Sequence, residues 1–198
     1  MTSPVFNSAR PDPLFDPIQT KRLIIRTFDR KDRQAFFAYK VMPEAVRFQS
    51  WRPQTIDEVD NFIREVQAVI PNTPGTWLQV AVCLKESGEL IGDIGMHFLE
   101  DGRQMEIGYT LSPDHWGKGY AAEAVTAVIN YLFRGLKKHR ITASVDPRNS
   151  RSIALLERMG MRREAYFVKS YPEGDTWLDD VVYAILEEEW FQRNPDET

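Results

Sequence analysis

Apolar positions along this chain follow the period of a strand or of a helix in successive segments, and turn residues separate the segments. Alternating or short apolar runs between turns predict strands, and an apolar position every three to four residues predicts a helix. The expected elements, in chain order, are a strand over residues 22–28, helices over about 30–42 and 56–70, strands over 77–85, 90–99 and 104–111, a helix over about 121–138, a strand over 140–145, a helix over about 149–159, and strands over about 163–171 and 176–186.

Turn chemistry indicates how the central strands are connected. Ser87-Gly88 and Asp101-Gly102 separate three consecutive strands, and such pairs are typical of tight hairpins. These strands should therefore form an antiparallel meander with no helix between them. We expect a single α/β (α+β) domain, in which a central mixed, mostly antiparallel sheet is flanked by about four helices.

The expected domain covers residues 21–190, with short segments outside it. Residues 1–20 contain four prolines and no apolar run, which is typical of an extended or disordered arm, and residues 191–198 should form a tail. No apolar run approaches the ~20 residues needed to cross a bilayer, so no membrane contact is expected. The single cysteine, Cys83, has apolar neighbours and indicates a core thiol in a reducing cytoplasm.

Two glycines and two alanines stand at the start of the helix expected near residue 121. They lie in the segment His115-Trp-Gly-Lys-Gly-Tyr-Ala-Ala-Glu-Ala124. Small residues allow close approach of a ligand to the backbone, and the first amides of a helix point outward at its positive end. This combination predicts an anion site, most naturally for a phosphate or pyrophosphate.

Two other kinds of phosphate loop fit this segment less well. A P-loop is excluded because G-x-x-x-x-G-K-[ST] is absent. Gly117-x-Gly119-x-x-Ala122 does satisfy a dinucleotide fingerprint, with Asp146 near the position of a ribose-binding acid. However, the preceding strand alternates polar and apolar residues and belongs to a meander, whereas a dinucleotide fold needs a buried parallel strand.

The charge distribution favours a polyanionic ligand near this turn. The net charge of −4 argues against general nucleic-acid binding. Between residues 117 and 163, ten basic residues face three acidic ones, a balance of +7, and the remainder of the chain has a balance of −11. A basic segment that begins at the turn fits a polyanion, and the acidic remainder fits a cationic second substrate.

The element order and Trp116-Gly117-Lys118-Gly119-Tyr120-Ala121 resemble the GNAT superfamily of acetyltransferases, whose cofactor loop is usually written Q/R-x-x-G-x-G/A. Gly119 and Ala121 occupy the two small positions, and Trp116 stands where Gln or Arg is usual. In having Trp at this position the chain resembles one branch of the superfamily, the ribosomal-protein N-terminal (alanine/serine) acetyltransferase-like branch. Further segments are similar to the same branch: Arg22-Leu-Ile-Ile-Arg26, Trp51-Arg52-Pro53, and Asn149-x-x-Ser152 followed by Glu157-Arg-Met-Gly-Met161.

The resemblance implies acetyl-CoA as the acetyl donor, with no metal. Backbone amides of the turn should hold the pyrophosphate, and the strand ending at Leu111 should pair with the pantetheine arm and offer an amide to the thioester carbonyl. Asn149 should contact the arm, and Arg158, or Arg151 and Arg148, should meet the remaining phosphate. The cofactor-binding residues expected are Leu111, Trp116, Gly117, Lys118, Gly119, Tyr120, Ala121, Ala122, Asn149 and Arg158.

The expected reaction is attack of a neutral primary amine on the thioester. Glu106 is the candidate base, with Asp93 and His97 as weaker candidates, and Ser152 is the candidate acid for the departing sulfur, with Tyr109 or Tyr120 as alternatives. A protein or peptide α-amine is the favoured acceptor. A small-molecule amine (polyamine, aminoglycoside or amino-acid-like) or a non-catalytic acyl-CoA-binding role is the alternative, and a homodimer is compatible with the sequence.

Overall fold

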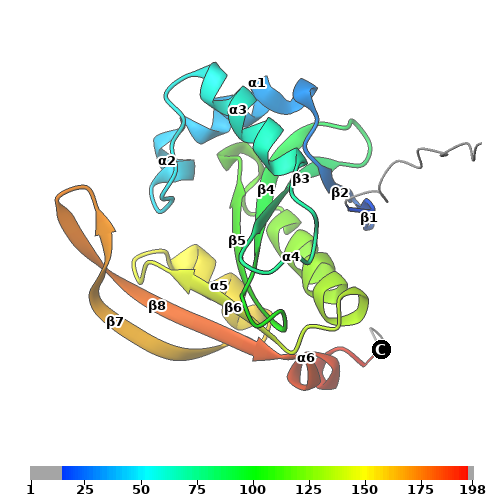
Figure 1. The fold of residues 1–198 in the computed structure, drawn as a ribbon, viewed down its shortest axis with the longest axis vertical. Helices are drawn as coiled ribbons and strands as arrows, with labels where there is room; N and C mark the ends of the chain where they lie inside the picture. Colours follow the sequence, from blue (N-terminus) through cyan, green and yellow to red (C-terminus); the bar gives the residue numbers. More distant parts are fainter. Residues whose placement is uncertain (1–14, 196–198) are drawn as a thin grey trace, which may run out of the picture.

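The computed structural model describes residues 15–195, and these form one sheet with helices on both faces (Figure 1). Those parts of the expected arm and tail that fall on residues 1–14 and 196–198 lie outside the described residues. The strands are β1 (Ile18–Gln19), β2 (Leu23–Thr27), β3 (Trp77–Leu84), β4 (Leu90–Phe98), β5 (Gln104–Leu111), β6 (Arg140–Val145), β7 (Arg162–Glu173) and β8 (Thr176–Leu186). The α-helices are α1 (Arg33–Lys40), α2 (Pro43–Val46), α3 (Ile56–Gln67), α4 (Tyr120–Asn130), α5 (Ser150–Arg158) and α6 (Glu187–Arg193).

The sheet has eight strands in the order β1-β2-β3-β4-β5-β6-β8-β7. Neighbouring strands are antiparallel except β5 and β6, which run parallel. This confirms the expected mixed, mostly antiparallel sheet. The expected meander is β3, β4 and β5, joined by hairpin turns.

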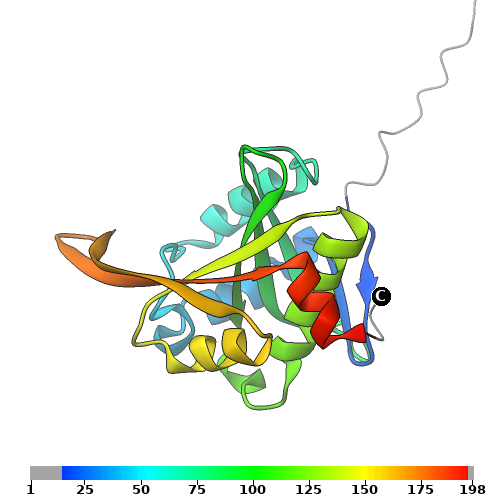
Figure 2. The same ribbon diagram turned by 90° about the horizontal axis from the view of Figure 1, so that it is seen from below.

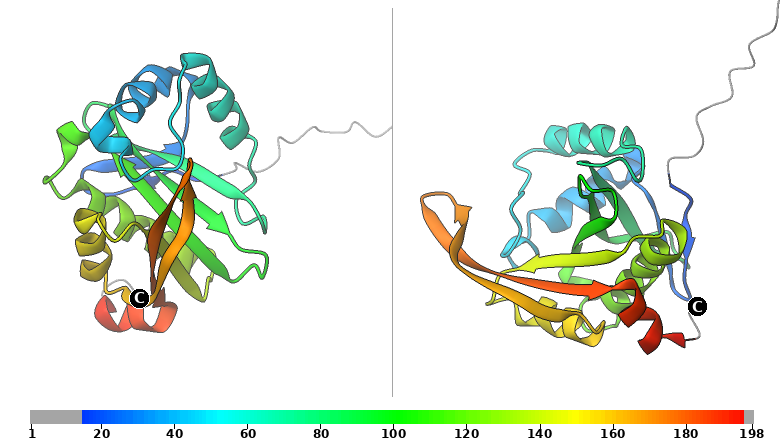
Figure 3. Two further views of the ribbon diagram at one scale, coloured as in Figure 1. Left: turned by 90° about the vertical axis from the view of Figure 1, so that its left-hand side faces the viewer. Right: turned by 60° about the horizontal axis from the view of Figure 1, so that its bottom comes forward.

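Helices lie on both faces of the sheet (Figure 3), and each face has its own core. On one face, α1 and α3 pack over β3 and β4 through a cluster that includes Phe36 and Ile63. On the other face, α4 and α5 cover the middle of the sheet through a larger cluster that includes Val128 and Leu156. We call these the α1/α3 face and the α4/α5 face. Side chains alternate between them along each strand.

Some helix boundaries differ from the expected ones for local reasons. The helix expected over 30–42 begins with a 3-10 turn, Arg30–Asp32, whose capping box joins Asp29 and Asp32. Pro43 does not merely end this helix: it is the first residue of α2, a position where its missing N–H has no cost. The helix expected over 121–138 ends its regular part at Asn130 and continues as a π-helical turn over Tyr131–Gly135.

Packing extends past both expected domain limits. Phe15 is buried, and its ring makes an edge contact with Tyr131 at 5.1 Å between centroids. At the other end, α6 continues to Arg193, and the ring of Phe191 packs against that of Phe133 with 6.3 Å between centroids. The packed body therefore includes residues on both sides of 21–190.

The β7–β8 hairpin extends well beyond the helices (Figure 2). Most of β7 is exposed, and its register with β8 is irregular between Phe167 and Tyr171. No helix among residues 15–195 is long and apolar enough to span a bilayer.

Candidate active site

The hydrogen-bonded pairing of β5 with β6 is short. It joins Gln104–Glu106 to Arg140–Thr142, and beyond this point β6 continues beside β8 while β5 diverges from it (Figure 1). Within the described residues, no strand pairs with this edge of β5 after Glu106. We call the region between residues 107–111 of β5 and residues 143–145 of β6 the sheet split.

The register of β4 with β5 decides which β5 amides point into the sheet split. Opposite pairs in an antiparallel ladder alternate between hydrogen-bonded and non-hydrogen-bonded. The amide of Ser112 donates to the carbonyl of Ile91 at 2.8 Å, which makes the neighbouring Leu111–Gly92 pair non-hydrogen-bonded. The backbone groups of Leu111, and two residues earlier those of Tyr109, therefore point away from β4 and toward the split.

The glycine turn lies between the end of β5 and the start of α4. Gly117 and Gly119 have φ values of 73° and 80°, in the left-handed region that favours glycine. Gly119 is the N-cap of α4 and offers no side chain to the helix, and the amide of Glu123 is the first to bond one turn back, to Gly119. The amides of Tyr120, Ala121 and Ala122 are thus left for an external acceptor.

Trp116 fixes the end of β5 to this turn. Its indole N–H donates to the carbonyl of Leu111 at 2.9 Å, so its polar atom is occupied within the protein. The guanidinium of Arg151, on α5, lies over the Trp116 ring at 4.4 Å. The structure therefore brings Arg151 to the turn.

The other two arginines expected near phosphate are placed differently. Arg148 forms an ion pair with Asp146 at 2.5 Å. Arg158 is the last residue of α5, about 12 Å along the helix from its first turn. It lines a cavity of about 350 Å³ together with Trp190 and Arg193.

Ser152 and Tyr109 meet at the sheet split, on the α4/α5 face. Their hydroxyl oxygens lie 2.8 Å apart, and burial raises the pKa of the Tyr109 phenol to about 12. Asn149 caps α5, because its side chain accepts a hydrogen bond from the amide of Ser152 at 3.2 Å. Tyr120, the other alternative acid, instead stacks beneath the guanidinium of Arg22 at 4.5 Å.

Glu106 lies on the opposite, α1/α3 face, at the last residue of the short β5–β6 pairing. Burial raises its pKa above the ordinary 4.5, His97 acts against this effect, and Asp180 adds to it. His97 is directly opposite on β4, with Nδ1 3.9 Å from Oε2 of Glu106, and its ring stacks on Trp77 at 4.7 Å. A half-buried carboxylate with a raised pKa is a suitable proton acceptor.

Asp93, a weaker candidate for the base, is committed to a buried network. Its carboxylate forms an ion pair with Lys40 at 3.1 Å and accepts hydrogen bonds from Tyr39 and Gln79. Lys40 also donates to the hydroxyl of Thr110 at 3.1 Å. No local sequence signal marks this role of Lys40, since Asp93 and Thr110 lie on strands more than 50 residues away.

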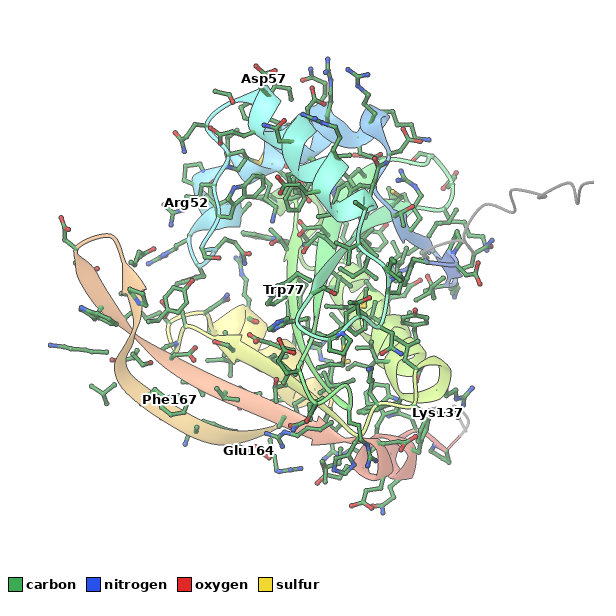
Figure 4. All side chains as sticks on the ribbon, in the orientation of Figure 1. Arg52, Asp57, Trp77, Lys137, Glu164 and Phe167 are labelled. Atoms are coloured by element: carbon green, nitrogen blue, oxygen red, sulfur yellow. The ribbon has the colours of Figure 1, made fainter. Side chains whose placement is uncertain are left out.

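A bare patch lies between Glu106 and this network. The patch is the exposed Gly108 of β5, where a Cβ would lie more than 4 Å from every described heavy atom outside its neighbours. Gly95, directly opposite on β4, is buried, and a Cβ there would contact Gln79 and Trp77. The patch is on the α1/α3 face. In Figure 4 the exposed Trp77 lies near the centre of the view, and Arg52 is on the segment between α2 and α3. Arg52 forms an exposed ion pair with Glu173 of the β7–β8 hairpin at 3.4 Å, so the two segments meet at this side of the sheet.

Comparison with known proteins agrees with this geometry. The family described as acetyltransferase (GNAT) domain matches residues 22–162. "Uncharacterized N-acetyltransferase YnaD" of Bacillus subtilis (strain 168) is 35% identical over 173 residues, which cover 87% of this chain and 98% of that protein. The ribosomal protein uS5-alanine N-acetyltransferase of Escherichia coli (strain K12) is 40% identical over 85 residues, which cover 42% of this chain and 43% of that protein.

A solved structure gives the same result. The crystal structure of a GNAT-family acetyltransferase from Bacillus anthracis superposes with a TM-score of 0.79 at 34% identity, covering 87% of this chain and 99% of that one. The expected relation to ribosomal-protein acetyltransferases is confirmed at the level of the family. Because the family match covers most of the chain and a relative above 30% identity aligns along nearly its whole length, this chain is an N-acetyltransferase of the GNAT family.

Proposed function

We propose that this enzyme transfers the acetyl group of acetyl-CoA to the α-amine of a protein or peptide. The observation that carries the proposal is the sheet split: it begins at Glu106, ends beside the glycine turn, and has Ser152 and Tyr109 on its other face. A ligand lying in the split would contact both faces of the sheet. The donor would enter from the α4/α5 face and the acceptor from the α1/α3 face.

The donor side is supported by three sets of groups. The free amides at the start of α4 suit a pyrophosphate, and Arg151 adds positive charge beside them. The outward-pointing amides of β5 suit the peptide-like pantetheine arm. The Tyr109 amide lies about 10 Å along the strand from Glu106 and the Leu111 amide about 17 Å. We assign the Tyr109 amide to the thioester carbonyl and the Leu111 amide to the arm.

The chemistry then follows from these positions. The amine nitrogen attacks the carbonyl carbon, and the Tyr109 amide stabilises the oxyanion that forms. Glu106 accepts the proton of the amine, directly or through a water. The carbon–sulfur bond breaks, and the thiolate takes a proton from Ser152 or Tyr109, whose high pKa keeps the phenol protonated at neutral pH.

An α-amine acceptor is supported by the weakness of the proton acceptor available. An α-amino group, with a pKa of about 7.7–8.0, is partly neutral at pH 7, whereas a lysine amine near 10.4 is almost fully charged. A single carboxylate such as Glu106 is sufficient for the former. The local likeness to the uS5-alanine acetyltransferase points the same way. A reducing cytoplasm suits the buried, unpaired Cys83.

Release of thiol from acetyl-CoA by the purified enzyme tests the proposal. The acceptors are a peptide with a free N-terminal alanine, the same peptide with a blocked N-terminus and an internal lysine, and spermidine. We expect turnover with the free α-amine alone. Turnover with spermidine and not with the peptide would overturn the α-amine assignment. That result would favour a polyamine acceptor, whose positive charges would be attracted by the carboxylates of Glu106 and Asp180 on the acceptor side.

A further inference from the structure

Glu123 poses an electrostatic problem for the cofactor turn. It lies in the first turn of α4, next to the amides assigned to the pyrophosphate. A carboxylate there interacts favourably with the positive end of the helix and competes with an anionic ligand for it. An unrestrained carboxylate at this position would therefore oppose cofactor binding.

The hairpin between β1 and β2 holds this carboxylate. Oε1 of Glu123 accepts hydrogen bonds from the Thr20 hydroxyl at 2.6 Å and from the Arg22 amide at 2.7 Å. Oε2 accepts from Nε of Arg22 at 2.6 Å. Although burial raises the pKa of Glu123, these bonds outweigh it and lower that pKa below its ordinary value. The carboxylate therefore stays ionised, and its charge is compensated by Arg22 while its oxygens are held by the segment between β1 and β2.

The same guanidinium also crosses the turn. Nη1 of Arg22 donates to the carbonyl of Lys118 at 2.9 Å, and the group stacks on the ring of Tyr120. In a trans peptide the C=O and the following N–H point in opposite directions. Fixing the Lys118 carbonyl toward Arg22 therefore directs the Gly119 amide away from Arg22. A Cβ at Gly119 would lie 3.4 Å from Nη2, so the turn and the guanidinium are in close contact.

We propose that Arg22 is a positioning residue for cofactor binding: it holds Glu123 away from the anion site and fixes the orientation of the Lys118–Gly119 peptide. Thr20 completes the arrangement, which we call the Arg22 clamp. The proposal rests on the proposed function, because it assumes that the turn binds the CoA pyrophosphate. It assigns a role in the site to a segment about 100 residues away in sequence.

Titration calorimetry with CoA measures the effect of the Arg22 clamp. Loss of a charge-assisted hydrogen bond costs enough to raise the Kd about tenfold in Arg22→Ala. Arg22→Lys keeps the charge and cannot reach both Glu123 and the Lys118 carbonyl, so an intermediate Kd is expected. In Arg22→Ala/Glu123→Gln the exposed carboxylate is gone, and the variant should bind CoA more tightly than Arg22→Ala.

Arg26, four residues after Arg22 and within β2, provides a matched control. It forms a two-pronged ion pair with Asp32, and its contacts lie outside the turn. Arg26→Ala should lower the melting temperature and leave the CoA Kd within about twofold of the unaltered enzyme. Equal weakening by Arg26→Ala, an unchanged Kd in Arg22→Ala and Arg22→Lys, or a double variant no tighter than Arg22→Ala would overturn the proposal.

Hydrogen exchange in the free enzyme separates this proposal from the proposed function. The amide of Glu123 bonds to Gly119 at 3.1 Å, and its exchange should be faster in Arg22→Ala than in Arg26→Ala. Equal exchange in both variants would overturn the Arg22 clamp whether or not CoA binds. Absence of CoA binding by the unaltered enzyme would instead overturn the assignment of the turn.

Discussion

The hydroxyl oxygens of Tyr109 and Ser152 lie 2.8 Å apart and connect the middle of β5 to the first turn of α5. The Tyr109 hydroxyl also lies 3.3 Å from the Ser152 carbonyl oxygen, so it contacts both oxygens of the serine. The two residues come from segments separated by 43 positions. Their pairing places exchangeable protons at the sheet split, where the proposed mechanism needs a donor for the departing thiolate.

Removing either hydroxyl should slow turnover more than it weakens cofactor binding. We expect Ser152→Ala and Tyr109→Phe to lower kcat by about 100-fold, the usual contribution of a positioned acid, and to leave the CoA Kd within about threefold. Tyr183→Phe is the matched control, because its hydroxyl bonds to Glu157 away from the split. An unchanged kcat in Ser152→Ala and Tyr109→Phe would remove the pair from the mechanism.

Glu106→Gln should lower activity and stabilise the fold. As the proton acceptor, Glu106 should contribute about 100-fold or more to kcat/KM. The α-amine of the peptide, with a pKa of about 7.7–8.0, sets the first fall of kcat/KM on the acidic side. The raised pKa of Glu106 should add a second fall at a pH above 4.5, the ordinary value for this group. The measurement is kcat/KM against pH with the α-amine peptide. An identical profile in Glu106→Gln would show that another group or water accepts the proton.

The effect of the same substitution on stability depends on pH with a defined sign. The folded protein binds the Glu106 proton more tightly than the unfolded chain, because burial raises its pKa. The resulting stabilisation is complete below the unfolded pKa and is lost as pH rises through the folded pKa. Glu106→Gln should therefore raise the melting temperature at pH 7 by more than at pH 4. A constant difference across this range would contradict the burial of the charge.

Breaking the buried Lys40–Asp93 pair should destabilise the enzyme strongly. Lys40→Met leaves the Asp93 carboxylate buried without its cation, which costs about 3–5 kcal/mol of unfolding free energy. Urea denaturation measures this. The control is Arg52→Ala, which removes an exposed pair with Glu173 and should change the free energy by less than about 1 kcal/mol. Similar values for the two variants would show that Lys40 contributes no more than a surface charge.

Local signals predicted those parts of the fold that neighbouring residues decide. Capping residues lie where the sequence predicts helix starts near 56 and 149: the side chains of Thr55 and Asn149 each accept a hydrogen bond from the amide three residues later. Gly160 follows α5 with a left-handed φ of 82°. The glycine turn can be predicted because small residues before a helix allow a ligand to approach the free backbone amides. Pro43, by contrast, is compatible with both the end and the start of a helix, and only the packing of Ala45 and Val46 decides between them.

The site depends on pairings between distant segments, and the sequence does not specify these. Glu106 and Asp93 are both carboxylates on neighbouring strands, but Lys40 and Tyr39 surround only Asp93. Ion pairs with residues outside it also reduce the excess positive charge of the basic segment 117–163. Arg140 and Arg162 form ion pairs with Glu164, which removes part of its excess charge.

Gly108 should be a position where added bulk excludes the acceptor and spares the cofactor. It faces the α1/α3 side of the sheet, two residues from Glu106, and its φ is not in the left-handed region, so larger residues fit the backbone. Strand positions favour such residues over glycine, and stability should not fall. Gly108→Leu should lower kcat/KM for the peptide by about 100-fold through misplacement of the amine.

The test compares CoA binding with peptide turnover in the same variant. The CoA Kd of Gly108→Leu should stay within about twofold, because the proposed donor site lies on the α4/α5 face, and Gly108→Ala should have an intermediate effect on the peptide. Equal loss of CoA and peptide binding would place both substrates on one face of β5. Unchanged kcat/KM in Gly108→Leu would show that the acceptor binds neither at the bare patch nor beside Glu106.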